Sequence, residues 1–482
     1  MPIHIYNSLS RKKEEFHSLK PNEIKIYTCG PTVYDEPHIG HARSAYIFDV
    51  IRRYLAYQGY KVKFVRNVTD VDDKIIDRAK KEFPGEDLNA AFKKVSEKYL
   101  TSYHEALKSL NIGVDQEKIF EPKASEYIPK MVKFIQGLID KGAAYLSAGD
   151  VYFDITKAKS YGKLSNQSLE KMESGTRVAP NKNKRNPLDF ALWKSAKADE
   201  PSWDSPWSAG RPGWHIECSV MSSDILGNEF DIHGGGIDLI FPHHENEIAQ
   251  SEASGEKFAR YWIHHGLLTI NGQKMAKSLG NFVTVNSFLE KYKNADLLKL
   301  LFLSTRYAHP VDYTDEKIQE AKQALERILI LVNKIDVVSK SQSLKVSSKS
   351  VKQIEEIKNK FIAAMDDDFN TPQALASIFD LVSLANKHIG DIDFIHRAKD
   401  TLRELLDIFG ISLKSTKSVT ITSDSYIVSA ITDKEIEQKI MERNKARDNK
   451  DYLLSDTIRK ELEEKGIILE DTKEGTTWRR KI

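Results

Sequence analysis

Three stretches near the N-terminus decide the fold: Ile24-Lys-Ile-Tyr-Thr-Cys29, Pro37-His-Ile-Gly-His41 and Lys61-Val-Lys-Phe-Val-Arg-Asn-Val68. The first and third alternate between polar and apolar residues, as strands do. Between them, apolar residues recur with the spacing of a helix until Gly59. Because a strand–helix–strand unit makes its two strands parallel, we expect an α/β fold with a ligand site beyond the carboxyl ends of the strands.

Length and composition limit what kind of protein this is. The chain has 482 residues, enough for several domains, with 40% hydrophobic and 29% charged residues. Its net charge of +2 gives no overall basic field, so a nucleic-acid partner would have to be held by local patches and by shape. We find no apolar run near the roughly 20 residues of a membrane span and no secretory signal, and therefore expect a cytoplasmic protein.

Further along the chain the patterns are less regular. Residues 87–142 have a helical pattern, Asp150–Asp154 predicts an edge strand, and the Trp/Pro/Ser/Gly-rich stretch 182–213 predicts an ordered loop. Asn271-Gly272 is typical of a two-residue hairpin turn. After Asp315 the pattern is helical almost throughout.

The His38-Ile-Gly-His41 turn lies where a strand leads into a helix N-terminus. Backbone N–H groups and the positive end of the helix dipole favour an anion there. Gly40 removes a Cβ that would obstruct a base or ribose, and both imidazoles can donate hydrogen bonds to phosphate oxygens. A pair of ordinary surface histidines remains the alternative.

A second candidate for phosphate binding is the loop Lys274-Met-Ala-Lys-Ser278, bounded by Gly272 and Gly280. Its two lysines can close on a triphosphate, although a solvated lysine loop is common. Together, the turn and the loop predict that ATP activates a carboxylic acid here. Such chemistry needs positioning and charge neutralisation and no protein nucleophile. The sequence contains no competing Walker or Ser-His-Asp arrangement.

A metal site is predicted from four residues far apart in sequence. His243 and Glu247 are four residues apart and project from one helix face, while Cys29 ends the first strand and Cys218 precedes the helix. Two thiols, an imidazole and a carboxylate are a plausible tetrahedral zinc set. Ile248 occupies the place of the second histidine of a zincin, which excludes that motif. Packed thiols and a surface His–Glu pair remain the alternative.

Segments spread over essentially the whole chain resemble the class I aminoacyl-tRNA synthetases, and within that class the cysteinyl-tRNA synthetase family. The segments are Tyr27–Tyr34, His38–Arg43, Arg66–Lys74, Gly210–Cys218, Phe230–Gly236, Phe241–Glu247, Lys274–Ser278, Met365–Pro372 and Gly475–Arg479. One departure is visible, since Ala276 stands where the signature loop of the family usually has serine. Both lysines and Ser278 remain.

The resemblance implies a cysteine–tRNA ligase whose substrates are ATP, L-cysteine and tRNA(Cys), with one zinc ion per chain and magnesium accompanying ATP. Zinc would bind the substrate thiolate, and a serine hydroxyl would bind poorly because it stays protonated. The implied residue roles are as follows: Cys29, Cys218, His243 and Glu247 hold zinc; His38, His41, Lys274 and Lys277 are catalytic; His38, Gly40, His41, Lys277 and Ser278 bind ATP; Thr69, Trp214 and His233 line the cysteine pocket; Trp478, Arg479 and Arg480 contact tRNA.

The implied architecture is a Rossmann-type catalytic domain with an insertion, a helical bundle and an anticodon-recognition module, in a monomeric protein. The expected parts are residues 1–120 (first half of the catalytic domain), 121–212 (insertion), 213–265 (second half), 266–314 (signature loop and stem contact), 315–410 (helical bundle), 411–427 (linker) and 428–482 (anticodon module).

Three other functions are compatible with parts of the sequence. A ligase of the same superfamily could pass cysteine to an amino-sugar, but it would not need the region beyond Val428. A zinc hydrolase could use Glu245 as its base, but it would leave the ATP motifs unexplained. The same objection applies to a non-catalytic RNA-binding module, and the terminal Trp478-Arg-Arg-Lys stretch could be no more than a basic tail.

Overall fold

The computed structural model describes residues 2–113, 119–168, 182–198, 200–339, 348–413, 433–465, 467–472 and 475–480. It divides into two compact units, Met1–Ser412 and Leu413–Ile482. The predicted linker lies mostly outside the described residues. Each unit is described by itself below.

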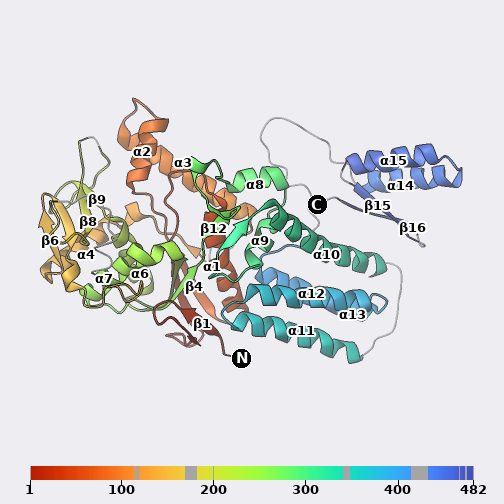
Figure 1. Cartoon of the computed structure of the whole chain (residues 1–482), viewed down its shortest axis with the longest axis horizontal. Coiled ribbons are helices and arrows are strands. Elements are labelled where there is room, and N and C mark those ends of the chain that lie inside the picture. Colours follow the sequence, from red (N-terminus) through yellow and green to blue (C-terminus); the bar gives the residue numbers. More distant parts are fainter. Residues whose placement is uncertain are drawn as a thin grey trace. The chain divides into compact units, whose positions relative to one another are not determined.

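The first unit is built on a five-stranded sheet in which every described pairing is parallel, which confirms the α/β fold class. The strand order is β11-β10-β3-β4-β5 (Figure 1). The strands are β3 (Glu23–Thr28), β4 (Lys61–Arg66), β5 (Ile119–Phe120), β10 (Phe230–Gly236) and β11 (Ala259–His265). Because β3 and β10 are central neighbours, residues that follow them in sequence meet at one edge of the sheet.

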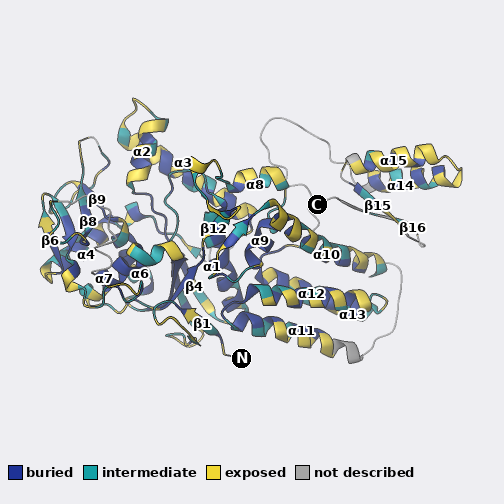
Figure 2. Cartoon of the chain, viewed as in Figure 1, coloured by how far each residue is buried: buried dark blue, intermediate teal, exposed yellow. Residues whose placement is uncertain are grey.

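Helix α1 (Ile39–Tyr57) connects β3 to β4 and is buried over most of its length (Figure 2). Its close approach to the sheet requires glycine in β10, because a Cβ on Gly234 would lie 2.2 Å from the Phe48 ring. A similar constraint applies just after β3, where a Cβ on Gly30 would lie 1.6 Å from the carbonyl oxygen of Asn67. The strand ends that carry the predicted site are therefore tightly packed.

A four-stranded antiparallel sheet lies between the two halves of the parallel sheet in sequence, in the order β6-β7-β8-β9. Its strands are β6 (Ala144–Ser147), β7 (Asp150–Phe153), β8 (Phe190–Ser195) and β9 (Gly210–Pro212). The edge-strand prediction was wrong, because β7 pairs with β6 on one side and β8 on the other. The ordered-loop prediction was also wrong over β8 and β9, because the Pro/Gly content of the flanking residues obscured the two strands.

Helices α2 (Asp73–Glu82), α3 (Leu88–Ser109), α4 (Ile128–Asp140), α6 (Trp214–Leu226) and α7 (Glu245–Ser254) complete this part, and a short β1–β2 hairpin (His4–Asn7, Lys12–Glu15) precedes it. The helical pattern predicted over 87–142 missed β5, a two-residue strand that pairs with β4.

The predicted hairpin at Asn271-Gly272 is confirmed. It joins β12 (Leu268–Ile270) to β13 (Gln273–Lys274), and Asn271 and Gly272 have φ angles of 50° and 74°. Positive φ at both positions is what a two-residue turn of this kind needs. Strand β12 also pairs with β14 (Val311–Tyr313), and helices α8 (Val285–Tyr292) and α9 (Asp296–Leu303) follow the signature loop.

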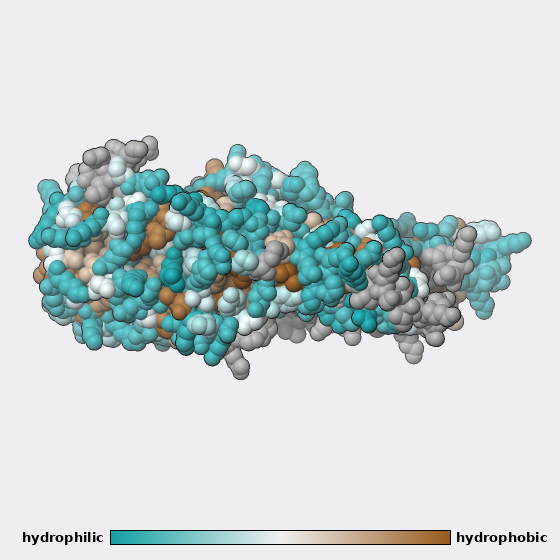
Figure 3. All heavy atoms as spheres, turned by 90° about the horizontal axis from the view of Figure 1, so that it is seen from below, coloured by the Kyte–Doolittle hydropathy of each residue, from teal (hydrophilic) through white to brown (hydrophobic). Residues whose placement is uncertain are grey.

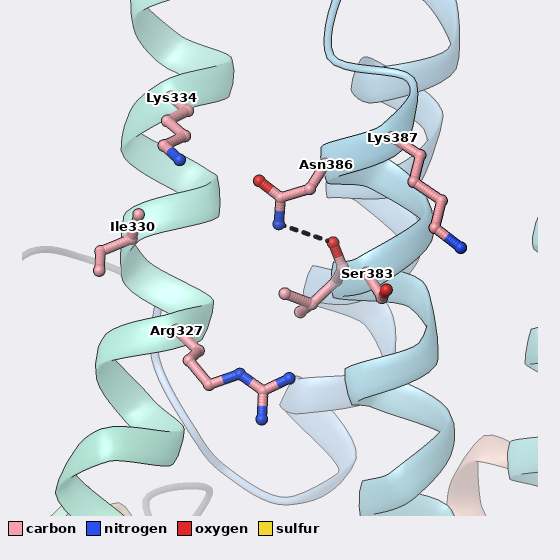
Figure 4. Close-up of a pocket in the computed structure, with 7 residues that line it drawn as sticks. Arg327, Ile330, Lys334, Ser383, Asn386 and Lys387 are labelled. Carbon is pink, nitrogen blue, oxygen red and sulfur yellow. Dashed lines mark hydrogen bonds between the residues drawn. The ribbon is translucent and has the colours of Figure 1, made fainter. Parts of the chain in front are cut away.

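The predicted helices after Asp315 are α10 (Asp315–Ser339), α11 (Ser348–Asp366), α12 (Thr371–Lys387) and α13 (Ile392–Ile408), which pack side by side (Figure 1). A groove of about 430 Å³ runs between α10 and α12 (Figure 4). Its lining includes three cations and no acidic residue: Arg327, Ile330, Lys334, Val382, Ser383, Asn386 and Lys387.

The second unit contains α14 (Asp433–Asp448), α15 (Tyr452–Glu464) and an antiparallel hairpin of β15 (Ile467–Thr472) and β16 (Gly475–Arg480). Six buried aliphatic residues form its core, and Trp478 packs against them: Ile436, Ile440, Ile458, Leu462, Ile467 and Leu469. Buried Arg443 donates to the Asp471 carboxylate at 2.8 and 2.9 Å, which ties α14 to the hairpin.

The face seen in Figure 3 is largely hydrophilic, with only small apolar patches. Among the described helices, none is long and apolar enough to cross a bilayer.

Arg43 ties α1 to the segments around β12 and β14. Its buried guanidinium donates to the carbonyl oxygens of Gly266 (2.5 Å), Leu267 (2.6 Å), Tyr307 (3.3 Å) and His309 (2.6 Å). Burial lowers its pKa to about 10, so the group remains cationic at neutral pH. These bonds hold the base of the signature loop against the helix that follows the histidine turn.

Replacing Arg43 with methionine would leave buried carbonyl groups without a donor. We expect Arg43→Met to lower the free energy of unfolding by about 3 kcal/mol in urea denaturation, because each unpaired buried polar group costs about 1–3 kcal/mol. Arg260→Met, at an exposed position on β11, is the matched control and should change stability little. Equal stabilities of the two variants would contradict this role for Arg43.

Candidate active site and metal centre

The structure brings together the four residues predicted as metal ligands. Cys29 directly follows β3, Cys218 lies in α6, His243 lies in the turn before α7, and Glu247 lies in the first turn of α7. Their ligand atoms all lie within 4.8 Å of one another. Because these residues come from separate elements, the cluster depends on the packing of α6 and α7 against the end of β3.

The distances within the cluster suit a single ion. The Cys29 and Cys218 sulfurs are 3.7 Å apart, Cys29 Sγ lies 3.7 Å from Glu247 Oε1, and His243 Nε2 lies 3.0 Å from the same oxygen. The other ring nitrogen of His243 lies 2.9 Å from Nδ1 of His215. That outer contact orients Nε2 toward the cluster, as is usual for metal-binding histidines.

The electrostatics of the cluster also favour a bound cation. Burial raises the pKa values of Cys29, Cys218 and Glu247 and lowers that of His243 well below its usual range. In a buried site without a cation, these groups therefore tend toward their neutral forms. A divalent ion would supply the charge that ionises thiols and carboxylate, and a soft-to-borderline donor set of this kind fits zinc.

Sequence reasoning missed His244 beside the cluster, and it assigned His233 to the cysteine pocket and not to a possible ligand set. A second group of possible ligands consists of Cys29, His233, His244 and Glu247. His244 Nε2 lies 3.2 Å from Cys29 Sγ, and its Nδ1 lies 2.8 Å from Nε2 of His264. Since the two groups share Cys29 and Glu247, they describe one site with alternative ligands. The sequence did contain a signal for His244, because it directly follows His243. Both residues lie in the turn before α7, and each belongs to one of the two possible ligand sets.

Each of the three residues predicted for the cysteine pocket is linked to this cluster. The Trp214 ring stacks on His243 with centroids 4.1 Å apart, and 40% of Trp214 is exposed. Buried His233 lies with Nε2 2.7 Å from Glu247 Oε2. Thr69 accepts a bond from Asn67, whose amide oxygen lies 3.6 Å from Cys218 Sγ. The three side chains therefore approach the cluster from three elements.

His38 has a structural role that the sequence did not reveal. It is the N-cap of α1, and its Nδ1 accepts hydrogen bonds from the backbone N–H groups of Gly40 (3.1 Å) and His41 (3.2 Å). These bonds place the ring proton on Nε2, and burial lowers the pKa of His38 to about 4. The His41 ring stacks on it with centroids 3.6 Å apart. The turn therefore presents neutral imidazoles.

The signature loop lies beside this turn. A Cβ on Gly40 would lie 3.5 Å from Cε of Met275, and Lys277 lies 5.0 Å above the Phe282 ring, which in turn contacts His38. Lys277 forms an ion pair with Asp35, which lies between β3 and α1. The two segments predicted to bind ATP are therefore neighbours in space.

The loop residues around Lys277 are arranged by Asn281. Its side chain accepts from the backbone N–H of Ala276 at 2.9 Å and donates to the carbonyl of Lys274 at 3.1 Å. The backbone N–H of Ala276 therefore has a hydrogen-bond partner, although residue 276 has no side-chain hydroxyl. Lys274 and Ser278 are exposed, so both side chains are accessible to a ligand.

The three residues predicted to contact tRNA lie on β16 of the second unit. Trp478 packs against the core of that unit, so only part of its ring is accessible. The side chains of Arg479 and Arg480 fall outside the described part of the structure.

Comparison with known proteins places this chain in one class of enzymes. The family model described as the class I (C) tRNA synthetase catalytic domain matches residues 15–323, and a DALR domain matches residues 360–414. Two solved structures share the fold. A methionyl-tRNA synthetase of Mycobacterium tuberculosis has a TM-score of 0.59 and 16% identity, with 80% of this chain and 89% of that chain covered. A putative arginyl tRNA synthetase of Campylobacter jejuni has a TM-score of 0.55 and 16% identity, with 83% and 95% covered.

Closer relatives narrow the class further. The chain is 46% identical to a cysteine–tRNA ligase of Persephonella marina and 47% identical to one of Sulfurihydrogenibium, with complete coverage of both chains in each case. An enzyme of the same name from Aquifex aeolicus is 44% identical, with 100% of this chain and 99% of that protein covered. The chain therefore belongs to the cysteine–tRNA ligase family.

The two roles of His38 can be separated by substitution. Asparagine is a good N-cap but lacks an imidazole Nε2–H, whereas alanine provides neither function. We expect His38→Ala to lower the free energy of unfolding by about 1 kcal/mol and His38→Asn to change it little. Both variants should lose ATP–pyrophosphate exchange activity. Full activity in His38→Asn would show that capping is the only function of the residue.

Proposed function

We propose that the chain activates L-cysteine with ATP to form cysteinyl-adenylate and then transfers the cysteinyl group to tRNA(Cys). One observation carries the proposal: Cys29 and His38 lie at the two ends of a single connection, the one between β3 and α1. A thiol held at the metal cluster and phosphates held at the histidine turn are thereby brought to the same end of the sheet.

In the first step, the cysteine carboxylate would attack the α-phosphorus of ATP and release pyrophosphate. His38 and His41 would donate hydrogen bonds from neutral imidazoles to the phosphate oxygens, stabilising charge that develops in the transition state. Lys277, together with Lys274, would neutralise the departing pyrophosphate after Lys277 leaves Asp35. Magnesium would arrive with ATP.

Selection of cysteine would occur at the cluster of Cys29, Cys218, His243 and Glu247, which we assign as the site of one zinc ion per chain. Bound zinc would accept the thiolate of cysteine as a further ligand and would hold the hydroxyl of serine poorly. Trp214 would cover the substrate from the exposed side, while Thr69 and His233 would shape the buried side. Such selection removes the need for a separate editing site.

The acceptor is proposed to be tRNA(Cys), bound in part by the second unit through β16 and its neighbouring basic residues. An unpaired anticodon base could stack on the exposed part of Trp478 while Arg479 and Arg480 contact phosphates. We further propose that the protein acts as a monomer in the cytoplasm, and we assign the parts of the chain as expected from the sequence.

The alternatives are weaker on chemical grounds. An amino-sugar ligase would have no use for the second unit, and the relatives that match the whole chain are named as cysteine–tRNA ligases. A hydrolase would need Glu245 as a free base. Its carboxylate instead accepts backbone N–H bonds from Gly162 (2.9 Å) and Ser165 (2.7 Å). A purely RNA-binding module would leave the paired ATP segments without a function.

Replacing Cys218 with serine tests the selection step. We expect Cys218→Ser to contain much less than the one zinc per chain of the unaltered protein, because a neutral hydroxyl replaces a thiolate ligand. The ratio of cysteine- to serine-dependent ATP–pyrophosphate exchange should fall by at least about tenfold, since a pocket without the metal separates such near-isosteres only modestly.

The matched control is Ser222→Ala, which changes a buried small side chain one turn further along α6 and should keep both the metal and the selectivity. A Cys218→Ser protein with full zinc content and full selectivity would refute the zinc assignment.

Removing the second unit tests the acceptor. A chain that ends at Ser412 should retain cysteine-dependent ATP–pyrophosphate exchange, because the proposed ATP and cysteine sites lie within the first unit. Its affinity for tRNA(Cys) and its aminoacylation rate should fall by at least about tenfold. The retained exchange activity serves as the internal control for folding. Undiminished tRNA binding and aminoacylation would contradict the assignment of the second unit to tRNA recognition.

A further inference from the structure

Helix α2 places two cations against the connection between β3 and α1, beside the two segments proposed to bind ATP. Arg78 Nη1 lies 3.7 Å from Oδ2 of Asp35, the carboxylate that also pairs with Lys277. One helical turn earlier, the Lys74 ammonium lies 5.3 Å from the centre of the Tyr34 ring. Residues four apart share a helix face, so a single face of α2 directs both cations toward this connection.

Lys74 has no acidic partner within the part of the chain that the structure describes. The two residues before it are acidic, but both are otherwise engaged. The Asp72 carboxylate caps α2 by accepting the backbone N–H of Lys74 at 2.8 Å. Asp73 pairs with Lys194 at 3.0 Å and with Arg211 at 2.5 Å. Because Lys74 is also exposed, its ammonium is available to an anion that arrives from solution.

Tyr34 holds this ammonium near the histidine turn. The face of an aromatic ring attracts a cation, and Tyr34 lies in the connection that leads to His38. The ring is half-buried and packs against an apolar core to which α2 and α3 contribute. The fold therefore fixes the position of the ring, and with it the region that the Lys74 ammonium occupies.

The charge of Lys74 also reaches the second histidine of the turn. Burial is the main cause that lowers the pKa of His41 well below its usual range, and smaller contributions come from His38 and Lys74. Lys74 is therefore near enough to disfavour a positive charge on His41. Since a neutral imidazole still donates one hydrogen bond, the ammonium of Lys74 and the ring N–H of His41 can contact the same anion.

We propose that Lys74 is a further phosphate-binding residue, which contacts the phosphate chain of ATP from α2. This inference rests on the proposed function. A triphosphate carries more negative charge than the two lysines of the signature loop neutralise, so a third cation on a separate element has a function there. Because Lys74 belongs to a helix, its charge is in place before Lys277 leaves Asp35. Lys74 therefore contributes to the initial binding of ATP, whereas the loop lysines act later.

Binding of ATP and of adenosine, measured by calorimetry without cysteine, separates this role from a structural one. In Lys74→Met, we expect the Kd of ATP to rise about tenfold or more, as for loss of a charge-assisted hydrogen bond, and that of adenosine to stay within about twofold. In ATP–pyrophosphate exchange, the KM for ATP should rise in parallel, while kcat and the KM for cysteine change less than about threefold. Lys80→Met, at an exposed position on another face of α2, is the matched control and should change none of these values.

Two further substitutions test the charge and its placement. Lys74→Arg keeps a cation and should retain most of the affinity for ATP. Tyr34→Phe keeps the aromatic face and should bind ATP as the unaltered protein does, whereas Tyr34→Leu should bind it about threefold more weakly.

An equal loss of affinity for ATP and adenosine in Lys74→Met, or no loss for either, would overturn the inference. So would a defect confined to the transfer of cysteine to tRNA, because the cation would then serve the nucleic acid. Absence of cysteine-dependent exchange in the unaltered protein would instead refute the proposed function itself.

Discussion

The connection between β3 and α1 is the constraint on which the rest of the site depends. It begins at Cys29, which must point into the metal cluster, and it ends at His38, which must cap the helix. Neither end can shift independently, because Gly30 is packed against the backbone at Asn67 and Gly234 is packed against Phe48. The parallel sheet therefore fixes the separation between the proposed thiol and phosphate subsites without any dedicated bridging group.

Burial without compensating charge recurs throughout this site. His38 is held neutral at one end of the connection, and the thiols and carboxyl groups near Cys218 are raised in pKa at the other. Each of these groups is unfavourable in isolation and becomes favourable with a cation or phosphate in place. The site therefore has the electrostatics expected of one that is completed by its proposed ligands, which are a metal ion, ATP and an amino acid.

Much of the fold and site could be predicted from the sequence because the decisive signals are local. Alternation and helical spacing marked β3, α1 and β4, and Asn271-Gly272 marked its hairpin. Short strands such as β5 and β9 could not be predicted in the same way, because their pairing depends on partners distant in sequence. The second ligand set escaped prediction for a related reason, since His233 on β10 and His244 in the turn before α7 approach Cys29 only through the packing of these segments. The capping role of His38 was not predicted, because the sequence analysis gave this residue only a phosphate-binding role.

The contact between Lys277 and Asp35 has a consequence for selectivity among anions. An exposed loop with two lysines would, without a nearby counter-ion, attract nucleic acids and inorganic phosphates indiscriminately. Because Lys277 is paired with Asp35, the positive potential of the loop toward these anions is reduced. A ligand that replaces the carboxylate and also contacts the histidine turn, as proposed for ATP, would gain both interactions. Other polyanions would have to displace Asp35 without the second gain, so the ion pair would weaken their binding.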